Sequence, residues 1–401
     1  MCSDATDNQD DREEQPQRHG FSTRAISDGD PPDEQTGAVI PPIYHATTYE
    51  MDGPGEPKAG YDYIRTGNPT RQALEEKLAS LENAEHGLFY ASGMSAIHCA
   101  LTTLDAGDEV VAEENVYGGT HRILTSLFDK YNVSVKWIDA TDPDQLREAV
   151  TDDTDVLWLE TPTNPLLKVL DLELCAEVAD RHFVRSIVDN TLASPYLQNP
   201  LDHGIDAVVH SATKYIGGHT DALGGAIVTD EQDIYEEMKF FQNAIGAVPG
   251  TLENVTFLKG AKTLSLRMEQ ACENAMILAE FLQDHDRVRE VKYPGLSSHP
   301  QHDLAERQMK RPGALLSFVV DEDVEQNIRT FFEALELFPL AVSLGAVESL
   351  INHPWTMTHA PVPEDEKRAQ GITPGLVRIS VGVEDVDDLV QDLDHAFQLA
   401  S

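Results

Sequence analysis

Basic residues are scarce in this sequence. Its 401 residues include 29 Lys and Arg against 70 Asp and Glu, which gives a formal net charge of −41. Proteins that bind DNA or RNA hold the phosphates with clustered Lys and Arg, so the composition argues against nucleic acid as a partner. The same charge would repel an anionic membrane surface.

Cysteine pairs, basic leader sequences and long apolar runs are also missing. The four cysteines lie far apart, without a Cys-x-x-Cys pair or a histidine cluster at metal-ligand spacing, which predicts reduced core thiols and no metal site. No apolar run is long enough to span a membrane. The acidic start MCSDATDNQDDREEQ does not resemble a secretory signal. We therefore expect a cytoplasmic protein.

Lysine is especially rare, with 12 Lys against 17 Arg. Excess carboxylate with few lysines suits a cytosol at very high salt, where the self-repulsion of an acidic chain is screened. We therefore expect a halophilic protein that loosens in dilute buffer.

The residues that are present predict three regions. Residues 1–60 suggest an acidic arm, flexible over about the first 37 residues, followed by an extended segment. Within residues 61–253, apolar strands alternate with amphipathic helices, which predicts an α/β fold with a mostly parallel sheet and helices on both faces. Residues 254–401 predict a smaller α+β domain that begins with one long helix over 255–281. The strands expected are 87–90, 109–112, 133–138, 155–160, 185–189, 207–210, 288–293, 315–320 and 376–381.

Ligands of open α/β sheets bind beyond the carboxyl ends of the strands, so the residues that follow each strand are informative. Ser92-Gly93-Met94 opens a helix after the first strand, and free N–H groups at a helix start suit a phosphate, although a simple turn and cap would look the same. Asp189 ends a buried strand, where a carboxylate is costly unless a cation pairs with it.

Lys214 follows the last of these strands in the stretch Ser211-Ala212-Thr213-Lys214, 25 residues after Asp189. Its amine could form a Schiff base, while the hydroxyls of Ser211 and Thr213 could hold a phosphate on the same ligand. A late strand carries Arg378, which could bind an amino-acid carboxylate through two N–H groups. This combination of side chains matches the needs of pyridoxal phosphate.

Motifs along most of the chain then point to one family. The sequence resembles the trans-sulfuration enzymes, the pyridoxal-phosphate-dependent family of Cys/Met metabolism, whose fold is of the aspartate-aminotransferase type (fold type I). The matching stretches are 61–70 (YDYIRTGNPT), 91–96 (ASGMSA), 117–120 (YGGT), 160–165 (ETPTNP), 188–191 (VDNT), 211–219 (SATKYIGGH), 343–345 (SLG), 357–360 (MTHA) and 378–382 (RISVG).

The resemblance implies a role for each matched residue. Lys214 would bind pyridoxal 5′-phosphate and move protons, Asp189 would pair with the pyridinium nitrogen, and Tyr117 would stack on the ring and assist at the leaving group. The implied phosphate ligands are the N–H groups of Gly93 and Met94, the hydroxyls of Ser211 and Thr213, and Tyr63 and Arg65 of a neighbouring subunit.

The substrate carboxylate would meet Asn164 and Arg378, with Ser343 beside them. Because Tyr63 and Arg65 would come from another subunit, the site would need a homodimer, and the family pattern implies a tetramer. On spacing alone, Tyr63 and Tyr117 could be ordinary loop aromatics and Arg65 a surface ion pair. Structural support is the expected role of His219 and His359.

The resemblance implies an enzyme that acts on a small amino acid, with cystathionine γ-lyase as the first choice, cystathionine γ-synthase second and methionine γ-lyase third. Two positions give opposite indications of the substrate. Val342 stands where the cystathionine enzymes usually have Glu and methionine γ-lyases tend to have Val. Gly119 instead matches the cystathionine enzymes.

Two further kinds of protein stay open at the level of the sequence. One is a β-replacing or transaminating enzyme on the same fold, which the match of motifs along the whole chain disfavours. The other is a non-catalytic relative that binds partners, and the intact set of Lys214, Asp189 and Arg378 argues against it.

Overall fold

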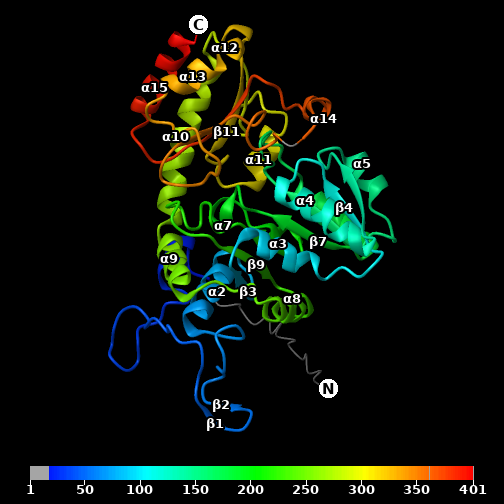
Figure 1. Ribbon diagram of the computed structural model, residues 1–401, viewed down its shortest axis with the longest axis vertical. Helices are drawn as coiled ribbons and strands as arrows, with labels where there is room; N and C mark the ends of the chain where they lie inside the picture. The colour runs from blue at the N-terminus through cyan, green and yellow to red at the C-terminus, as the bar shows by residue number, and fades with distance from the viewer. Residues whose placement is uncertain (1–17, 361, 401) are drawn as a thin grey trace, which may run out of the picture.

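Two sheets organise the molecule (Figure 1), and the computed structural model describes residues 18–360 and 362–400. The strands of the larger sheet are β3 His86–Tyr90, β4 Glu109–Glu113, β5 Ser134–Ile138, β6 Val156–Glu160, β7 Arg185–Asp189, β8 Ala207–His210 and β9 Gly225–Thr229. Their order is β3-β9-β8-β7-β6-β4-β5. The five strands from β8 to β5 are parallel, whereas β9 is antiparallel to both of its neighbours.

Helices cover both faces of this sheet, which explains why strands such as β6 are buried along their whole length. Residues of α3 and α8 pack on one face, and residues of α2, α5, α6 and α9 pack on the other. The helices of this region are α2 Pro69–Leu81, α3 Gly93–Leu101, α4 Gly118–Ser126, α5 Pro143–Ala149, α6 Leu172–His182, α7 Ser194–Leu197, α8 Gln232–Ile245 and α9 Thr251–Lys262, with 3-10 turns at Phe128–Tyr131 and Pro200–His203.

Side-chain caps fix where several helices begin. The Asn68 carboxamide oxygen accepts hydrogen bonds from the N–H groups of Thr70 and Arg71 at the start of α2, next to a proline at the first helical position. The Ser92 hydroxyl accepts from the N–H of Ser95 and begins α3. The first residue of α3, Gly93, lies close to Ser211, which directly follows β8.

The smaller sheet is antiparallel, in the order β10-β11-β13-β12. Its strands are β10 Val288–Lys292, β11 Leu315–Val320, β12 Leu350–Asn352 and β13 Leu376–Ser380. One hydrophobic core joins this sheet to α10 and α15. The helices here are α10 Leu264–Gln283, α11 His302–Gln308, α12 Glu322–Gln326, α13 Ile328–Ala334, α14 Glu364–Ala369 and α15 Val386–Leu399. The expected α/β fold, with a mostly parallel sheet and a smaller α+β part, is confirmed.

The N-terminal region differs from the sequence prediction. Residues 1–17 of the expected flexible arm lie outside the described residues. Within the rest of that arm, Phe21–Ser27 forms helix α1, in which Arg24 and Ala25 are buried. The buried Lys77 ammonium of α2 donates to the Ala25 carbonyl oxygen at 2.7 Å, which anchors α1. The extended segment that follows carries a short hairpin of β1 Met51–Gly53 and β2 Glu56–Pro57.

The single long helix expected over 255–281 is two helices, α9 and α10, which meet at Thr263. Arg267 explains the break, because its guanidinium donates to the carbonyl oxygens of Tyr215, Ile216 and Gly260 rather than pointing to solvent. The sequence prediction also missed β9, α8 and β12. The helix expected over 120–131 ends at Ser126 and continues as a 3-10 turn.

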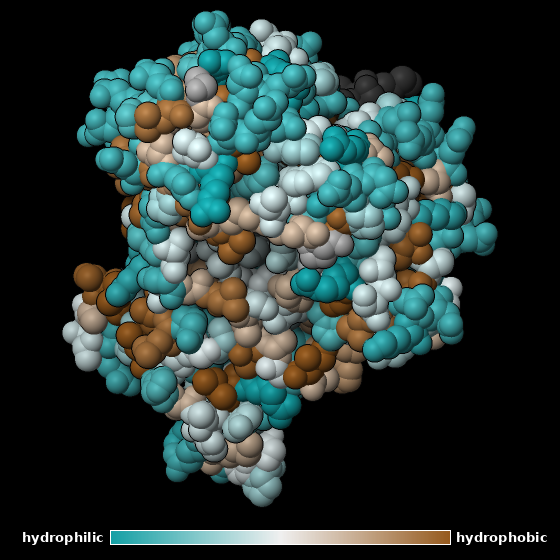
Figure 2. Space-filling view, turned by 45° about the horizontal axis from the view of Figure 1, so that its top comes forward, coloured by the Kyte–Doolittle hydropathy of each residue, from teal (hydrophilic) through white to brown (hydrophobic). Residues whose placement is uncertain are grey.

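The surface in Figure 2 is mostly hydrophilic, with apolar side chains gathered on the lower part of the face shown. Cys99, Cys175 and Cys272 are free thiols in the core, as expected, and Cys2 lies outside the described residues. Within the described ranges, every helix is too short or too polar to cross a membrane.

Candidate active site

Charged side chains converge at the carboxyl ends of β6, β7 and β8. Glu160 and Asp189 end adjacent strands and are register partners. Lys214 lies four residues beyond β8, and its ammonium donates to the Ser343 hydroxyl at 2.8 Å. Burial, with help from the Arg378 charge, lowers the pKa of Lys214 to about 8. A lysine with such a pKa holds a usable fraction of neutral, nucleophilic amine near neutral pH.

Asp189 is a buried carboxylate, only 5% exposed. It accepts a hydrogen bond from the Thr191 N–H at 3.0 Å, and burial raises its pKa. Among the described residues, it forms no ion pair. A buried carboxylate without a cationic partner is costly, so Asp189 fits a protonated pyridine nitrogen as its missing partner.

The start of α3 lies against Ser211. A Cβ on Gly93 would come 2.8 Å from the Ser211 Cβ, so glycine is needed for this approach. The Ser211 N–H donates to the Thr191 hydroxyl at 2.7 Å, while its own hydroxyl has no hydrogen-bond partner within the described chain. The Thr213 hydroxyl exchanges hydrogen bonds with the Gly224 backbone. Free N–H groups of a helix start beside an unused hydroxyl fit a phosphate.

Arg378 lies in β13 and is 2% exposed. Its guanidinium donates to the Asn164 side-chain oxygen at 3.0 Å and to the Ser343 carbonyl oxygen at 2.7 Å. Its Nε has no partner. Burial lowers the pKa of Arg378 to about 10, so it stays cationic at neutral pH. A buried cation with an unused donor fits a carboxylate ligand.

Ser343 joins these two cationic groups, since its hydroxyl accepts from Lys214 and its carbonyl oxygen accepts from Arg378. Its backbone has a φ of +85°, a strained conformation for a non-glycine residue. Burial, followed by the Arg378 charge, lowers the pKa of His359 to about 4, so this ring is neutral at physiological pH. His219 contacts the Gly217 carbonyl oxygen through Nδ1 at 2.7 Å.

Tyr117 precedes α4, and its N–H donates to Glu160 Oε2 at 2.6 Å. Its side chain is 47% exposed in the single chain. A Cβ at Gly119 would collide with the Met94 sulfur and the Tyr117 ring, so glycine lets these two side chains meet.

Tyr63 and Arg65 are not joined to this cluster by a hydrogen bond or ion pair within the described chain. The Arg65 guanidinium lies 5.7 Å from the centre of the Tyr63 ring and donates to the Asn243 carbonyl oxygen at 3.0 Å. Both side chains are exposed. Their expected place in a neighbouring subunit's site therefore stays a prediction.

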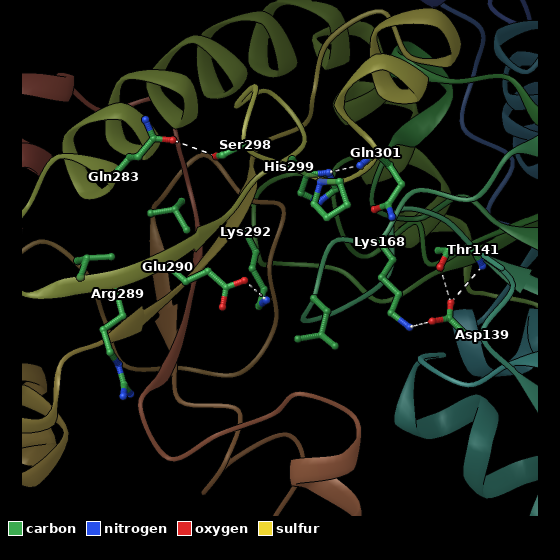
Figure 3. Close-up of a pocket in the computed structure, with 14 residues that line it drawn as sticks. Asp139, Thr141, Lys168, Gln283, Arg289, Glu290, Lys292, Ser298, His299 and Gln301 are labelled. Carbon is green, nitrogen blue, oxygen red and sulfur yellow. Dashed lines mark hydrogen bonds and ion pairs between the residues drawn. The ribbon is translucent and has the colours of Figure 1, made fainter.

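A separate pocket of about 590 Å³ lies between the loop that follows β5 and strand β10 (Figure 3). Its charged side chains form ion pairs, either with one another or with residues just outside the pocket. Lys168 Nζ lies 2.9 Å from Asp139 Oδ2, and Lys292 Nζ lies 2.6 Å from Glu290 Oε1. None of the expected site residues lines it.

Sequence reasoning missed two features of the cluster. It gave no role to Glu160, although a glutamate at the end of an apolar strand was a visible signal. It placed Ser343 near the substrate carboxylate but could not foresee its bond to Lys214, because the two residues are 129 positions apart.

Comparisons with known proteins agree with this chemistry. Residues 22–398 match the family model described as Cys/Met metabolism PLP-dependent enzyme. The chain is 45% identical to cystathionine gamma-lyase of Dictyostelium discoideum, covering 95% of this chain and 98% of that protein. It is 46% identical to cystathionine beta-lyase of Coxiella burnetii (94% and 97% covered) and 45% identical to cystathionine gamma-synthase of Mycobacterium bovis (94% and 96%).

The fold agrees as well. The solved structure of cystathionine gamma-lyase from Lactobacillus plantarum, complexed with L-serine, superposes with a TM-score of 0.92 at 40% identity, covering 95% of this chain and 99% of that one. The chain therefore belongs to the Cys/Met-metabolism family of pyridoxal-phosphate-dependent enzymes.

Proposed function

We propose that this enzyme is a cystathionine γ-lyase, which converts cystathionine and water to cysteine, 2-oxobutanoate and ammonia. The observation that carries the proposal is the bridge at Ser343, which brings a lysine of lowered pKa next to a buried, partly unpaired arginine. One group can move protons at the α- and β-carbons of an amino acid, and the other can hold its carboxylate.

In this proposal, Asp189 would pair with the ring nitrogen of pyridoxal phosphate, and Tyr117 would contact the ring. The N–H groups of Gly93 and Met94 and the hydroxyls of Ser211 and Thr213 would hold the phosphate. When bound, the cofactor supplies an aldehyde that condenses with amines and a ring that accepts electron pairs.

Arg378 and Asn164 orient the substrate by its α-carboxylate, so that the α-hydrogen faces Lys214. The Lys214 amine would take the α-proton, release it at C4′ of the cofactor and, neutral again, take a proton from Cβ, which would allow the γ-sulfur to leave. Tyr117 lies at the start of α4 and delivers the proton that the leaving thiolate needs.

Cystathionine γ-synthase is the second candidate, because a relative of that name is 45% identical. It would carry out γ-replacement of an O-acylhomoserine by cysteine. Position 342 is Val, 62% exposed, where the cystathionine enzymes usually have a Glu that could bind the distal ammonium of cystathionine. This residue favours methionine γ-lyase, which stays the third candidate because Gly119 matches the cystathionine enzymes.

We also propose a homodimer as the smallest active unit and a tetramer as the full assembly. Tyr63 and Arg65 are exposed, and so are apolar residues that a water-soluble monomer would bury: Val39, Ile40, Ile43, Phe240, Ile245, Leu252 and Leu266. We place the cofactor-binding domain at residues 61–253 and the small domain at 254–401.

The acidic composition supports a cytoplasmic, halophilic enzyme. We expect its melting temperature to rise from dilute buffer to molar KCl. Equal melting temperatures in the two buffers would contradict the halophilic assignment.

Product analysis in molar KCl with added cofactor tests the reaction. From cystathionine alone, we expect 2-oxobutanoate and cysteine in equal amounts. Pyruvate and homocysteine would indicate β-elimination. Cystathionine formed from O-acetyl- or O-succinylhomoserine and cysteine, with little oxo acid, would make the enzyme a γ-synthase.

A further inference from the structure

Glu160 is the last residue of β6 and is 2% exposed. Its carboxylate interacts with backbone N–H groups of two different segments. Oε2 accepts a hydrogen bond from the Tyr117 N–H at 2.6 Å, and the N–H of Asn164, four residues further along the chain, favours the charged form of the same carboxylate. The first segment carries the aromatic ring of the site, and the second carries the side chain that contacts Arg378.

The surroundings of Glu160 are unfavourable for a carboxylate. Burial raises its pKa well above the usual range, and the charge of the adjacent Asp189 adds to this effect. A buried carboxyl beside a like charge costs stability. Tertiary packing alone would be served better by an apolar side chain, so the value of Glu160 lies in the two backbone groups that it holds together.

We propose that Glu160 is a positioning residue that sets the spacing between Tyr117 and the Asn164–Arg378 pair, and thereby aligns the cofactor ring with the substrate carboxylate. This inference rests on the proposed roles of Tyr117, Asn164 and Arg378. In this role, Glu160 acts through the backbone of the two loops and not by its own contact with the cofactor or the substrate.

The test compares Glu160→Leu and Glu160→Gln with a matched control, Asp392→Asn. Asp392 is also a buried carboxylate, and it accepts two backbone N–H groups, those of Glu336 and Leu337, each at 2.9 Å, but it lies in α15. Three quantities are measured in molar KCl: the dissociation constant of pyridoxal phosphate from titration of the apoenzyme, KM and kcat for the substrate, and the melting temperature.

For Glu160→Leu, we expect the cofactor dissociation constant and KM each to rise roughly 10-fold, because the hydrogen bond from the Tyr117 N–H and the contact with the Asn164 N–H are both lost. Glu160→Gln should have a cofactor dissociation constant and a KM between those of Glu160→Leu and the parent, since an amide keeps one acceptor oxygen. Asp392→Asn should change the melting temperature and leave both constants within about twofold of the parent.

If the cofactor constant and KM of Glu160→Leu stay within twofold of the parent, the proposal is overturned. It is also overturned if Asp392→Asn raises them equally, because general loosening would then explain both variants. If the leucine variant does not fold, the glutamine variant decides by the same criteria. The cofactor titration does not depend on which substrate turns over, so a wrong choice of reaction is separable from a wrong role for Glu160.

Discussion

Two partly buried lysines, Lys214 and Lys168, have pKa values shifted in opposite directions by their surroundings. Lys214 lies in the strand-end cluster, and burial lowers its pKa to about 8 because the described residues offer it a hydroxyl but no ion-pair partner. Lys168 lies in the pocket of Figure 3, where burial would lower its pKa, but Asp139 and two nearby glutamates outweigh burial and raise it. Both sites carry several charged side chains. Only the first leaves buried charges in need of partners.

The same contrast holds for the other charges. In the cluster, Asp189 forms no ion pair among the described residues, although the Lys214 charge acts on it, and Arg378 keeps an unused Nε. In the pocket, Lys292 pairs with Glu290, and Arg289 pairs with Glu325. A ligand gains most from binding where buried charged groups lack partners, so the strand-end cluster is a better candidate for the active site than the pocket of Figure 3.

The largest loss of activity is expected from substituting Lys214. Lys214→Ala should lower turnover by on the order of 10⁴-fold or more and abolish the visible absorbance band of bound cofactor, because the proton-moving amine is gone. Steady-state kinetics and an absorbance spectrum check this. A yellow, active variant would refute the assignment of Lys214.

The second largest effect is expected at Arg378 of the cluster, compared with Arg289 of the pocket. Arg378→Lys should lower kcat/KM by roughly 100-fold, mainly through KM, because an ammonium cannot replace the planar fork of donors. Arg289→Lys, in the pocket, should stay within twofold of the parent. Equal effects of the two substitutions would contradict the difference between the sites.

The pKa of Lys214 predicts a pH dependence. Only the neutral amine condenses with an aldehyde, so cofactor capture by the apoenzyme should speed up about tenfold per pH unit below pH 8 and level off above it. Stopped-flow absorbance in molar KCl measures this rate. A rate still rising tenfold per unit between pH 9 and pH 10 would mean that Lys214 has an ordinary pKa.

The smallest effect on activity is expected from Lys168→Met. This change leaves Asp139 and Glu114 without their shared cation, which lies 2.9 Å and 3.1 Å from them, so the melting temperature should fall by a few degrees. The kcat should remain within twofold of the parent. A large loss of kcat with unchanged melting temperature would give the pocket a catalytic role.

The sequence predicted the parallel strands well, because strands buried on both faces are apolar runs bounded by turns. It also singled out Lys214, Asp189 and Arg378, whose places at strand ends or in a late strand are visible in the chain order. The α9–α10 break was hidden because it depends on Arg267 meeting carbonyl oxygens some 50 residues earlier.

The hydrogen bonds that connect the site residues could not be predicted. The Ser343 bridge and the bond between Tyr117 and Glu160 join segments far apart in the sequence, and no local pattern encodes such contacts. The expected places of Tyr63 and Arg65 in a neighbouring subunit's site stay predictions, which size measurement and mixed-mutant dimers can test.

The most direct test is to identify the lysine that binds the cofactor. The holoenzyme, reduced with borohydride and digested, should yield a single pyridoxyl-labelled peptide, the one that carries Lys214, when analysed by mass spectrometry. A label on Lys168 or another lysine, or no label at all on a cofactor-loaded protein, would contradict the central claim that the unpaired amine at the strand ends is the reactive group.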